Sequence, residues 1–140
     1  MTAIATQARL TLHADLAGDM MVSNPVSIRE DASVNDAILL FTRKGFSVAP
    51  VIDAAGRPIG VVSRSDVMIH ERPIAQGDNA NALVRDLMTP AVFSVSPHTT
   101  PATVIQEMLA LNVHHVFVVD ADGVLIGVIG ALDVLRLLQE

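Results

Sequence analysis

The sequence contains an internal duplication, which constrains its fold more than any other feature. A shift of 67 residues, without gaps, places the second half of the chain on the first and brings Asp19-Met20 onto Asp86-Leu87. The matches continue along the whole unit: Val51 with Val118, Asp53-Ala54 with Asp120-Ala121, Ile59-Gly60-Val61 with Ile126-Gly127-Val128, and Asp66-Val67 with Asp133-Val134. This period is longer than that of the common solenoid repeats. The pattern therefore indicates one subdomain that occurs twice.

Both copies predict the same order of elements, β-α-β-β-α. In the first copy Ser33 is a helix-capping residue, and Gly45 stands where that helix would end in a left-handed conformation. Thr100, Pro101 and Asn112 take the matching positions in the second copy. The predicted strands cover residues 26–28, 46–52 and 58–62, then 92–95, 113–119 and 125–129, and a final helix begins near residue 65 and near residue 132.

The middle strands of each copy are predicted to form a hairpin. Asp53 to Gly56 and Asp120 to Gly123 have Asp at the first turn position and Gly at the last. The strands are nearly continuous apolar runs, which favours a sheet covered on both faces. Because a half of about 60 residues buries too little surface alone, we expect the halves to pack about a pseudo-two-fold axis with two related clefts between them. The predicted class is α/β (α+β).

These patterns also predict the domain organisation. A leader over residues 1–13 precedes a first repeat over residues 14–72. A linker over residues 73–82, which contains Gly and Asn and breaks the apolar pattern, leads to a second repeat over residues 83–140.

Composition limits the classes of function. Of the 140 residues 51% are hydrophobic, which excludes a disordered chain, and the net charge of −6 argues against a nucleic-acid partner. The absence of cysteine excludes disulfides and thiolate zinc sites and is compatible with a cytoplasmic location. The longest apolar run, residues 123–132, is far shorter than the roughly 18 residues of a membrane span, and the first residues show no secretory signal.

Short motifs at matching places in the two copies resemble those of a known family. Each copy ends in Gly-apolar-apolar-x-x-x-Asp, as Gly60 to Asp66 and as Gly127 to Asp133, and opens with Asp-Met-Met or with Asp-Leu-Met-Thr-Pro. The middle strands, residues 46–51 and 113–118, fit the same pattern. In order, spacing and duplication, residues 14–140 resemble a tandem CBS-domain pair, also called a Bateman module.

This resemblance implies a regulatory binding module and not an enzyme. Such pairs bind adenosine-containing ligands (AMP, ADP, ATP or S-adenosylmethionine) between the two copies and need no cofactor. In the family, the Asp at the start of the last helix accepts hydrogen bonds from ribose hydroxyls. The Ser or Thr three residues earlier and nearby basic residues meet phosphate. Backbone at the start of the middle strand, contributed by the other copy, reads the adenine edge, and apolar residues near the first strand hold the ring.

The resemblance carries these roles onto two unequal clefts. Cleft one combines ten residues: Ser63, Arg64, Ser65, Asp66, Thr89, Val92, Phe93, Val113, His114 and His115. Cleft two combines eight residues: Val22, Val26, Phe46, Ser47, Val48, Ala49, Gly130 and Asp133. Gly130 stands where the family has Ser or Thr, and Ala131 stands at the position of Arg64. Cleft one is therefore expected to be the nucleotide site, and cleft two to hold a nucleoside or nothing.

Other interpretations of the same residues remain open. Ser63 and Asp66 also have the spacing of a helix cap. His114 and His115 are neighbours on a predicted strand, so their side chains should point to opposite faces and not share a metal ion. No metal site is predicted, because the spacings that mark one are missing. Nor does the sequence group a nucleophile with a base and an acid, so an enzyme is the weakest alternative.

A structural module is the main rival to the ligand-binding interpretation. In the family, pairs associate into homodimers through their helices and report to an effector protein outside the chain. Two helical stripes carry more apolar surface than one sheet face needs: Val34-Ala37-Ile38-Phe41 and Val104-Ile105-Met108-Leu111. The expectation is therefore a homodimer with no nucleic-acid or membrane partner, whose clefts bind a ligand or, in the rival interpretation, nothing.

Overall fold

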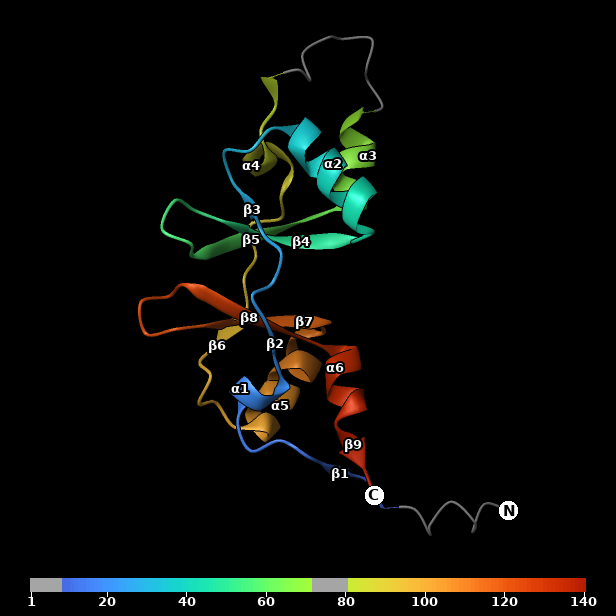
Figure 1. Ribbon diagram of the computed structural model, residues 1–140, viewed down its shortest axis with the longest axis vertical. Coiled ribbons are helices and arrows are strands. Elements are labelled where there is room, and N and C mark those ends of the chain that lie inside the picture. Colours follow the sequence, from blue (N-terminus) through green and yellow to red (C-terminus); the bar gives the residue numbers. More distant parts are fainter. Residues whose placement is uncertain (1–8, 72–80) are drawn as a thin grey trace, which may run out of the picture. The chain divides into compact units, whose positions relative to one another are not determined.

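The computed structural model describes residues 9–71 and 81–140 and divides them into two compact units (Figure 1). The first-repeat unit contains residues 26–71, 81–92 and 123–125. The second-repeat unit contains residues 9–25, 93–122 and 126–140. Most of the predicted linker lies outside the described residues. Each unit has its own sheet, its own helices and its own core.

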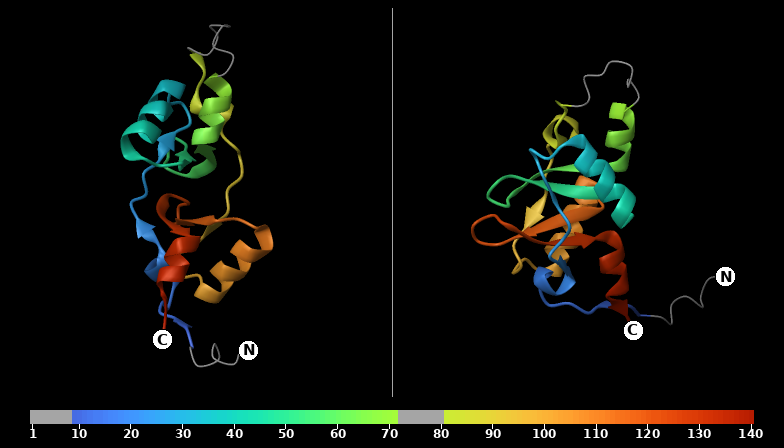
Figure 2. Two further views of the ribbon diagram at one scale, coloured as in Figure 1. Left: turned by 90° about the vertical axis from the view of Figure 1, so that its right-hand side faces the viewer. Right: turned by 45° about the horizontal axis from the view of Figure 1, so that its top comes forward.

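The first-repeat unit is a three-stranded sheet with helices beside it. Strand β4 lies in the middle, parallel to β3 and antiparallel to β5. Helices α2 and α3 lie side by side against this sheet (Figures 1 and 2). The elements are β3 (Ile28–Arg29), α2 (Val34–Lys44), β4 (Val48–Ile52), β5 (Pro58–Ser63), α3 (Arg64–Glu71) and α4 (Val84–Leu87).

The second-repeat unit repeats this plan and adds strands from the chain ends. Its sheet has the order β2-β8-β7-β6, and β1 pairs with β9 in a separate antiparallel ribbon. The elements are β1 (Thr11–Leu12), α1 (Ala17–Met20), β2 (Val22–Ser23), β6 (Ser94–Val95), α5 (Pro101–Leu111), β7 (His115–Val119), β8 (Leu125–Gly130), α6 (Ala131–Arg136) and β9 (Leu138–Gln139). None of the described helices has the length and apolar character needed to cross a membrane.

The local signals in the sequence are confirmed. The Ser33 hydroxyl accepts the backbone N–H of Asp36 at 3.1 Å and caps α2, and Gly45 ends that helix with φ 71°. Thr100 caps α5 in the same way, and Asn112 ends it with φ 54°. These residues form the caps because their short polar side chains satisfy free N–H groups, and because Gly and Asn tolerate the left-handed conformation.

The first hairpin turn is also confirmed. The backbone N–H of Gly56 donates to the carbonyl of Asp53 at 3.0 Å, and the Asp53 carboxylate accepts the N–H groups of Ala55 and Arg57, both at 2.9 Å. The hydrogen bond from Arg57 is the main cause that lowers the pKa of Asp53. Gly56 has φ 86°, a conformation that a side chain would strain.

The predicted first strands and middle strands start too early. The first strand is only Ile28–Arg29, since Pro25 has no N–H and Asn24 turns the chain with φ 52°. The middle strand starts at Val48 and not at residue 46, because the carbonyls of Phe46 and Ser47 accept hydrogen bonds from Arg64. The second repeat shows the same shortening, to Ser94–Val95 and His115–Val119.

The predicted β-α-β-β-α pattern lacks two short helices, α1 and α4. Each of them packs in the unit of the other repeat. Helix α4 lies at the start of the second repeat, yet Val84 and Arg85 donate to the carbonyls of Ala32 and Glu30 in the first-repeat unit at 2.8 and 3.0 Å. Helix α1 lies in the second-repeat unit, where the Ala17 N–H donates to a loop carbonyl at 2.8 Å. The lead-in of each repeat thus completes the core of the other.

The cores are mainly aliphatic and closely matched between the units, although Phe41 belongs to the first. The first-repeat core has the fully buried side chains of Ala37, Val51, Val62 and Val84 at its centre. In the second-repeat core the corresponding residues are Ala17, Val104, Val116, Val118 and Ile129. The junction between the hairpin and the last helix lies beside each core: Arg64 and Ser65 are exposed there in the first-repeat unit, whereas Gly130 is buried in the second.

Candidate functional site

Asp66 and Asp133 occupy equivalent positions, in the first turn of the helix that follows each hairpin. The Asp66 Oδ2 atom accepts the backbone N–H of Ser63 at 2.8 Å, and the Asp133 Oδ2 atom accepts that of Gly130 at 2.7 Å. A carboxylate is stable at a helix N-terminus because the free N–H groups and the helix dipole favour negative charge. Both carboxylates are therefore held in one orientation by the backbone three residues earlier.

The second oxygen of each carboxylate differs in its surroundings. The Asp66 Oδ1 atom has no hydrogen-bond partner among the residues that the structure describes. The Asp133 Oδ1 atom lies 3.7 Å from Nη1 of Arg136, whose side chain is 75% exposed, while that of Asp133 is 19% exposed. An exposed pair at this distance is weak, so both carboxylates keep an oxygen that can accept a hydrogen bond.

The Ser63 hydroxyl completes the cap in the first-repeat unit. It accepts the backbone N–H of Asp66 at 3.1 Å, which is the capping interpretation of the Ser63 and Asp66 spacing. A hydroxyl group that accepts one hydrogen bond still has its own hydrogen to donate. Capping and ligand binding are therefore compatible here, whereas Gly130 offers no such hydroxyl group.

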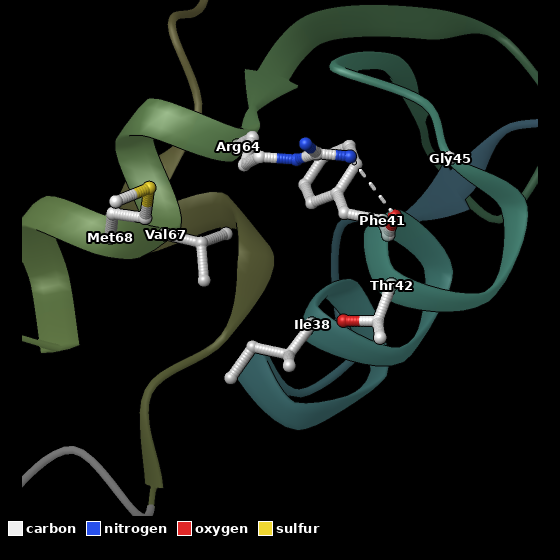
Figure 3. Close-up of a pocket in the computed structure, with 7 residues that line it drawn as sticks. All are labelled: Ile38, Phe41, Thr42, Gly45, Arg64, Val67 and Met68. Atoms are coloured by element: carbon white, nitrogen blue, oxygen red, sulfur yellow. Dashed lines mark hydrogen bonds between the residues drawn. The ribbon is translucent and has the colours of Figure 1, made fainter.

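Arg64 is engaged with the backbone of its own unit (Figure 3). Its Nη2 atom donates to the carbonyls of Phe41 at 3.2 Å and Phe46 at 2.9 Å, and its backbone N–H donates to the carbonyl of Ser47 at 2.8 Å. The side chain lines a groove of about 420 Å³ between α2 and α3. From the sequence, Arg64 is expected at a phosphate; in the structure its hydrogen bonds go to the end of α2 and to the two residues that precede β4.

The second repeat keeps only the backbone part of this arrangement. The N–H of Ala131 donates to the carbonyl of His114 at 3.0 Å, as the N–H of Arg64 does to Ser47. Ala131 has no guanidinium, and the matching groove between α5 and α6, of about 300 Å³, is lined by apolar side chains that include Leu109 and Leu135. The two grooves have the same place in the fold but different chemistry.

A backbone segment runs beside the last strand of each hairpin. Thr89 and Val61 exchange backbone hydrogen bonds of 2.8 and 3.0 Å in the first-repeat unit. Val22 pairs with Val128 in the second-repeat unit. A Cβ atom on Gly60 would lie 2.6 Å from the Thr89 carbonyl oxygen, and one on Gly127 would overlap the Met21 side chain. Close approach of these segments explains the glycine at the start of each repeated motif, a role that sequence reasoning missed.

His114 and His115 point in different directions, as expected for neighbours on a strand. His114 lines the groove between α5 and α6. The His115 ring lies against Gly130, with its Cδ2 atom 3.4 Å from the position that a Cβ on Gly130 would take. Burial is the main cause that lowers the pKa of His115; the nearby His114 lowers it further and Asp133 raises it.

The other predicted site residues divide between the units. In the first-repeat unit Ser65 on α3, Val26 and Phe46 are exposed. Val92 is half-buried there, and Ala49 is buried in the core. The second-repeat unit contains the half-buried Phe93, whose carbonyl accepts the N–H of Phe117 at 2.9 Å, and Val113, which packs against the core.

Within each unit, the structure therefore brings a carboxylate together with the start of the middle strand and one lead-in segment. The grouping of these residues across the two copies, expected from the resemblance, stays a prediction. Among the described residues, no three His, Asp or Glu side chains are placed to hold a metal ion.

Comparisons with known proteins agree with this arrangement. The family model described as CBS domain matches residues 17–71 and 84–140. The inosine-5′-monophosphate dehydrogenase of Korarchaeum cryptofilum is 32% identical over 84% of this chain, which spans only 23% of that enzyme. The crystal structure of CBSX2, a protein of Arabidopsis thaliana, in complex with AMP has 31% identity and a TM-score of 0.74, covering 88% of this chain and 95% of that one.

A second solved structure contains a different nucleotide. The cytosolic domain of the Mg²⁺ channel MgtE in complex with ATP has 27% identity and a TM-score of 0.73, and the match covers 87% of this chain and 48% of that one.

Proposed function

The chain belongs to the CBS-domain family, and we propose that it is a regulatory module that binds an adenosine nucleotide of the AMP, ADP or ATP type. Two similar structures hold AMP and ATP. The enzyme relative corresponds to this chain over only 23% of its length, so the likeness does not extend a dehydrogenase activity to this protein. Binding without catalysis is the function that these residues support best.

The observation that carries the proposal is the state of Asp66. One carboxylate oxygen is fixed by the Ser63 N–H at 2.8 Å, and the other has no partner among the described residues. A carboxylate can accept hydrogen bonds from two adjacent hydroxyl groups, such as those of ribose. Because its orientation is already fixed, binding costs Asp66 little conformational entropy.

Neighbouring groups fit the rest of a nucleotide. The Ser63 hydroxyl and the exposed Ser65 stand at the N-terminus of α3, where free N–H groups favour an anion. Arg64 fixes the carbonyls of Phe46 and Ser47, at the start of the middle strand in the same unit. We propose that this backbone, in place of the other copy's that the resemblance implied, reads the adenine edge beside Asp66. We assign Arg64 a positioning role and the Ser63 hydroxyl the contact with phosphate.

Ligand binding would act by shifting a conformational equilibrium. A ligand changes such an equilibrium only by the difference in its affinity for the two states. A nucleotide that holds the α3 terminus and the Phe46 backbone favours the conformation in which both are ordered. An effector protein that distinguishes these conformations would receive the signal.

A panel of ligands in a thermal unfolding assay tests this proposal. Adenosine, AMP, ADP, ATP and S-adenosylmethionine are added separately at millimolar concentration, with GMP as a matched control for the base. A ligand that binds only the folded state at 100 times its Kd stabilises by about 2.7 kcal/mol. We expect a higher Tm with at least one adenine nucleotide and a smaller change with GMP. No change with any of the five compounds would overturn the proposal.

A structural dimerisation module without a ligand is the second candidate. The helices of the second-repeat unit expose four large leucines: Leu109 is 75% exposed, Leu132 64%, Leu135 58% and Leu111 45%. Apolar side chains grouped at one surface often mark a protein interface. A homodimer is part of the main proposal too, so only the ligand panel separates the two candidates.

A further inference from the structure

One pair of cross-strand partners differs in side-chain size between the two repeats. Val48 and Ser63 are direct partners across the β4–β5 hairpin of the first-repeat unit. The shift of 67 residues places His115 and Gly130 at the same two positions of the second repeat. Val48 faces the small side chain of Ser63, whereas the larger His115 faces Gly130, which has no side chain. Cross-strand partners are the residues whose side chains interact most directly in a sheet.

The backbone does not require glycine at position 130. Gly130 has φ −101° and ψ 164°, an extended conformation that any residue adopts. A Cβ at this position would lie 3.3 Å from Asp133 Oδ2, 3.4 Å from His115 Cδ2 and 3.6 Å from His115 Nε2. The imidazole and the carboxylate therefore border the space that a side chain at position 130 would use. A Cβ there would touch the His115 ring at ordinary van der Waals distance, so it is the hydroxyl group of a serine, one bond further out, that would compete with the imidazole for space.

The exchange changes the chemistry beside the carboxylate. Asp66 has next to it a hydroxyl group, which accepts its N–H at 3.1 Å. Asp133 has an imidazole in place of the hydroxyl, and Ala131 in place of the arginine. Burial and the nearby His114 lower the pKa of His115, while Asp133 raises it. Arg136, 3.7 Å from Asp133, is the other charged group here and points out to solvent. Burial therefore favours the neutral form of the imidazole.

We infer that the His115–Gly130 pair sets the ligand preference of the second-repeat carboxylate, which takes an adenosine compound without a phosphate at its 5′ position. This inference rests on the proposed function. Asp133 supplies the acceptor for ribose hydroxyls, as Asp66 does. The hydroxyl group that would meet a phosphate at the first carboxylate is absent here, because Gly130 stands at the position of Ser63. A neutral imidazole offers a ring face and one N–H to an uncharged substituent, with no charge to attract an anion.

The test is a calorimetric titration of adenosine and of AMP into the Asp66→Ala variant, which lacks the carboxylate of the first-repeat unit. We expect this variant to bind adenosine about tenfold more tightly than AMP, the size of effect that one hydrogen bond to a charged group supplies. The double substitution His115→Val with Gly130→Ser restores the first-repeat pair and should reverse that preference. His115→Val alone should weaken adenosine without improving AMP, because it leaves no hydroxyl.

Three results would overturn the inference, and they are distinct from failure of the proposed function. AMP could bind the Asp66→Ala variant as tightly as adenosine does, or the double substitution could leave the ratio unchanged. The variant could also bind neither compound while the unmodified protein binds AMP, which leaves the proposed function intact and shows the second carboxylate to be unused. If the unmodified protein binds no adenosine compound, both the proposed function and this inference fail.

Thermal unfolding checks the pairing itself without any ligand. Gly130→Ser alone should lower the Tm by about 2–4 °C, because the new hydroxyl group must find room beside an imidazole that the Cβ already touches at 3.4 Å. His115→Val should remove most of this loss when the two changes are combined. Contacting residues show such non-additive effects, whereas independent sites add. Additive shifts would show that Gly130 does not serve to accommodate the imidazole.

Discussion

Nη2 of Arg64 donates to the carbonyl oxygen of Phe46 at 2.9 Å, across 18 positions of the sequence. The bond joins the first residue of α3 to the loop between α2 and β4. The same nitrogen reaches the Phe41 carbonyl at 3.2 Å, near the end of α2. A positive charge at the C-terminus of a helix is favourable because the free carbonyls there carry partial negative charge. Arg64 therefore supports the backbone of the proposed adenine subsite.

Replacing Arg64 with alanine should weaken folding and ligand binding together. Loss of two hydrogen bonds from an exposed charged group should cost about 1 kcal/mol of the free energy of unfolding. Since the guanidinium contacts carbonyls, the affinities for AMP and adenosine should fall by the same factor. Parallel titrations of both ligands measure this, with Arg43→Ala on the exposed end of α2 as the control. A loss confined to AMP would mean that Arg64 binds the phosphate.

Replacing Gly60 with alanine should destabilise the first-repeat unit. The new Cβ would lie 2.6 Å from the Thr89 carbonyl oxygen and 2.9 Å from Met88 Sδ. The backbone segment beside β5 must then move, at a cost of about 1–3 kcal/mol. Urea denaturation measures this cost, and Ala55→Gly in the exposed hairpin turn is a control for chain flexibility. An unchanged midpoint would contradict the close approach of Thr89.

The stability of the protein should depend on pH through His115. Burial makes its folded-state pKa lower than the ordinary value of 6.5. The unfolded chain then binds more protons as the pH falls below that value, so folding stability decreases. The contribution of His115 is complete above about pH 6.5 and is lost as the pH falls toward the folded-state pKa.

Thermal unfolding of the unmodified protein and of His115→Val at pH 5.0 and pH 7.5 measures this dependence. The difference in Tm between the two pH values should be smaller in the variant. The substitution His98→Val, at an exposed turn near the start of α5, serves as the control and should keep the difference. If His115→Val shows the full pH dependence, another group causes it.

Replacing Leu135 with glutamate should disrupt the proposed homodimer. The Leu135 side chain is 58% exposed and lines the apolar groove between α5 and α6. A charge buried in an interface without a partner is strongly unfavourable. Light scattering at micromolar concentration should give the mass of one chain for this variant and of two chains for the control Gln106→Glu. If light scattering gives the mass of one chain for the unmodified protein too, the proposed dimer is contradicted.

The local parts of the fold could be predicted because single residues specify them. Ser33 and Thr100 cap helices through their own side chains, and Gly45 and Asn112 end them through backbone conformation. Each of these features depends on residues within four positions of one another. The duplication added a second, independent instance of each signal.

Long-range packing could not be predicted in the same way. Val84 and Ala17 belong to lead-in segments that fill the core of the other repeat's unit, and no local pattern shows which core they join. Arg64 fits a phosphate contact by its position in the motif, but its partners are carbonyls 18 and 23 residues earlier. From the sequence alone, Gly130 is only a missing serine; the structure shows that the His115 ring borders the space that a side chain there would use.

The most direct test of the central claim is a calorimetric titration of AMP into three proteins: the unmodified chain, Asp66→Ala and Asp133→Ala. Both substitutions remove one carboxylate from the same position of the same motif, so each is the matched control of the other. Circular dichroism confirms that both variants fold. The proposed site predicts that Asp66→Ala weakens AMP binding at least tenfold, while Asp133→Ala leaves most of it. If Asp133→Ala abolishes AMP binding and Asp66→Ala does not, the nucleotide site is wrongly assigned.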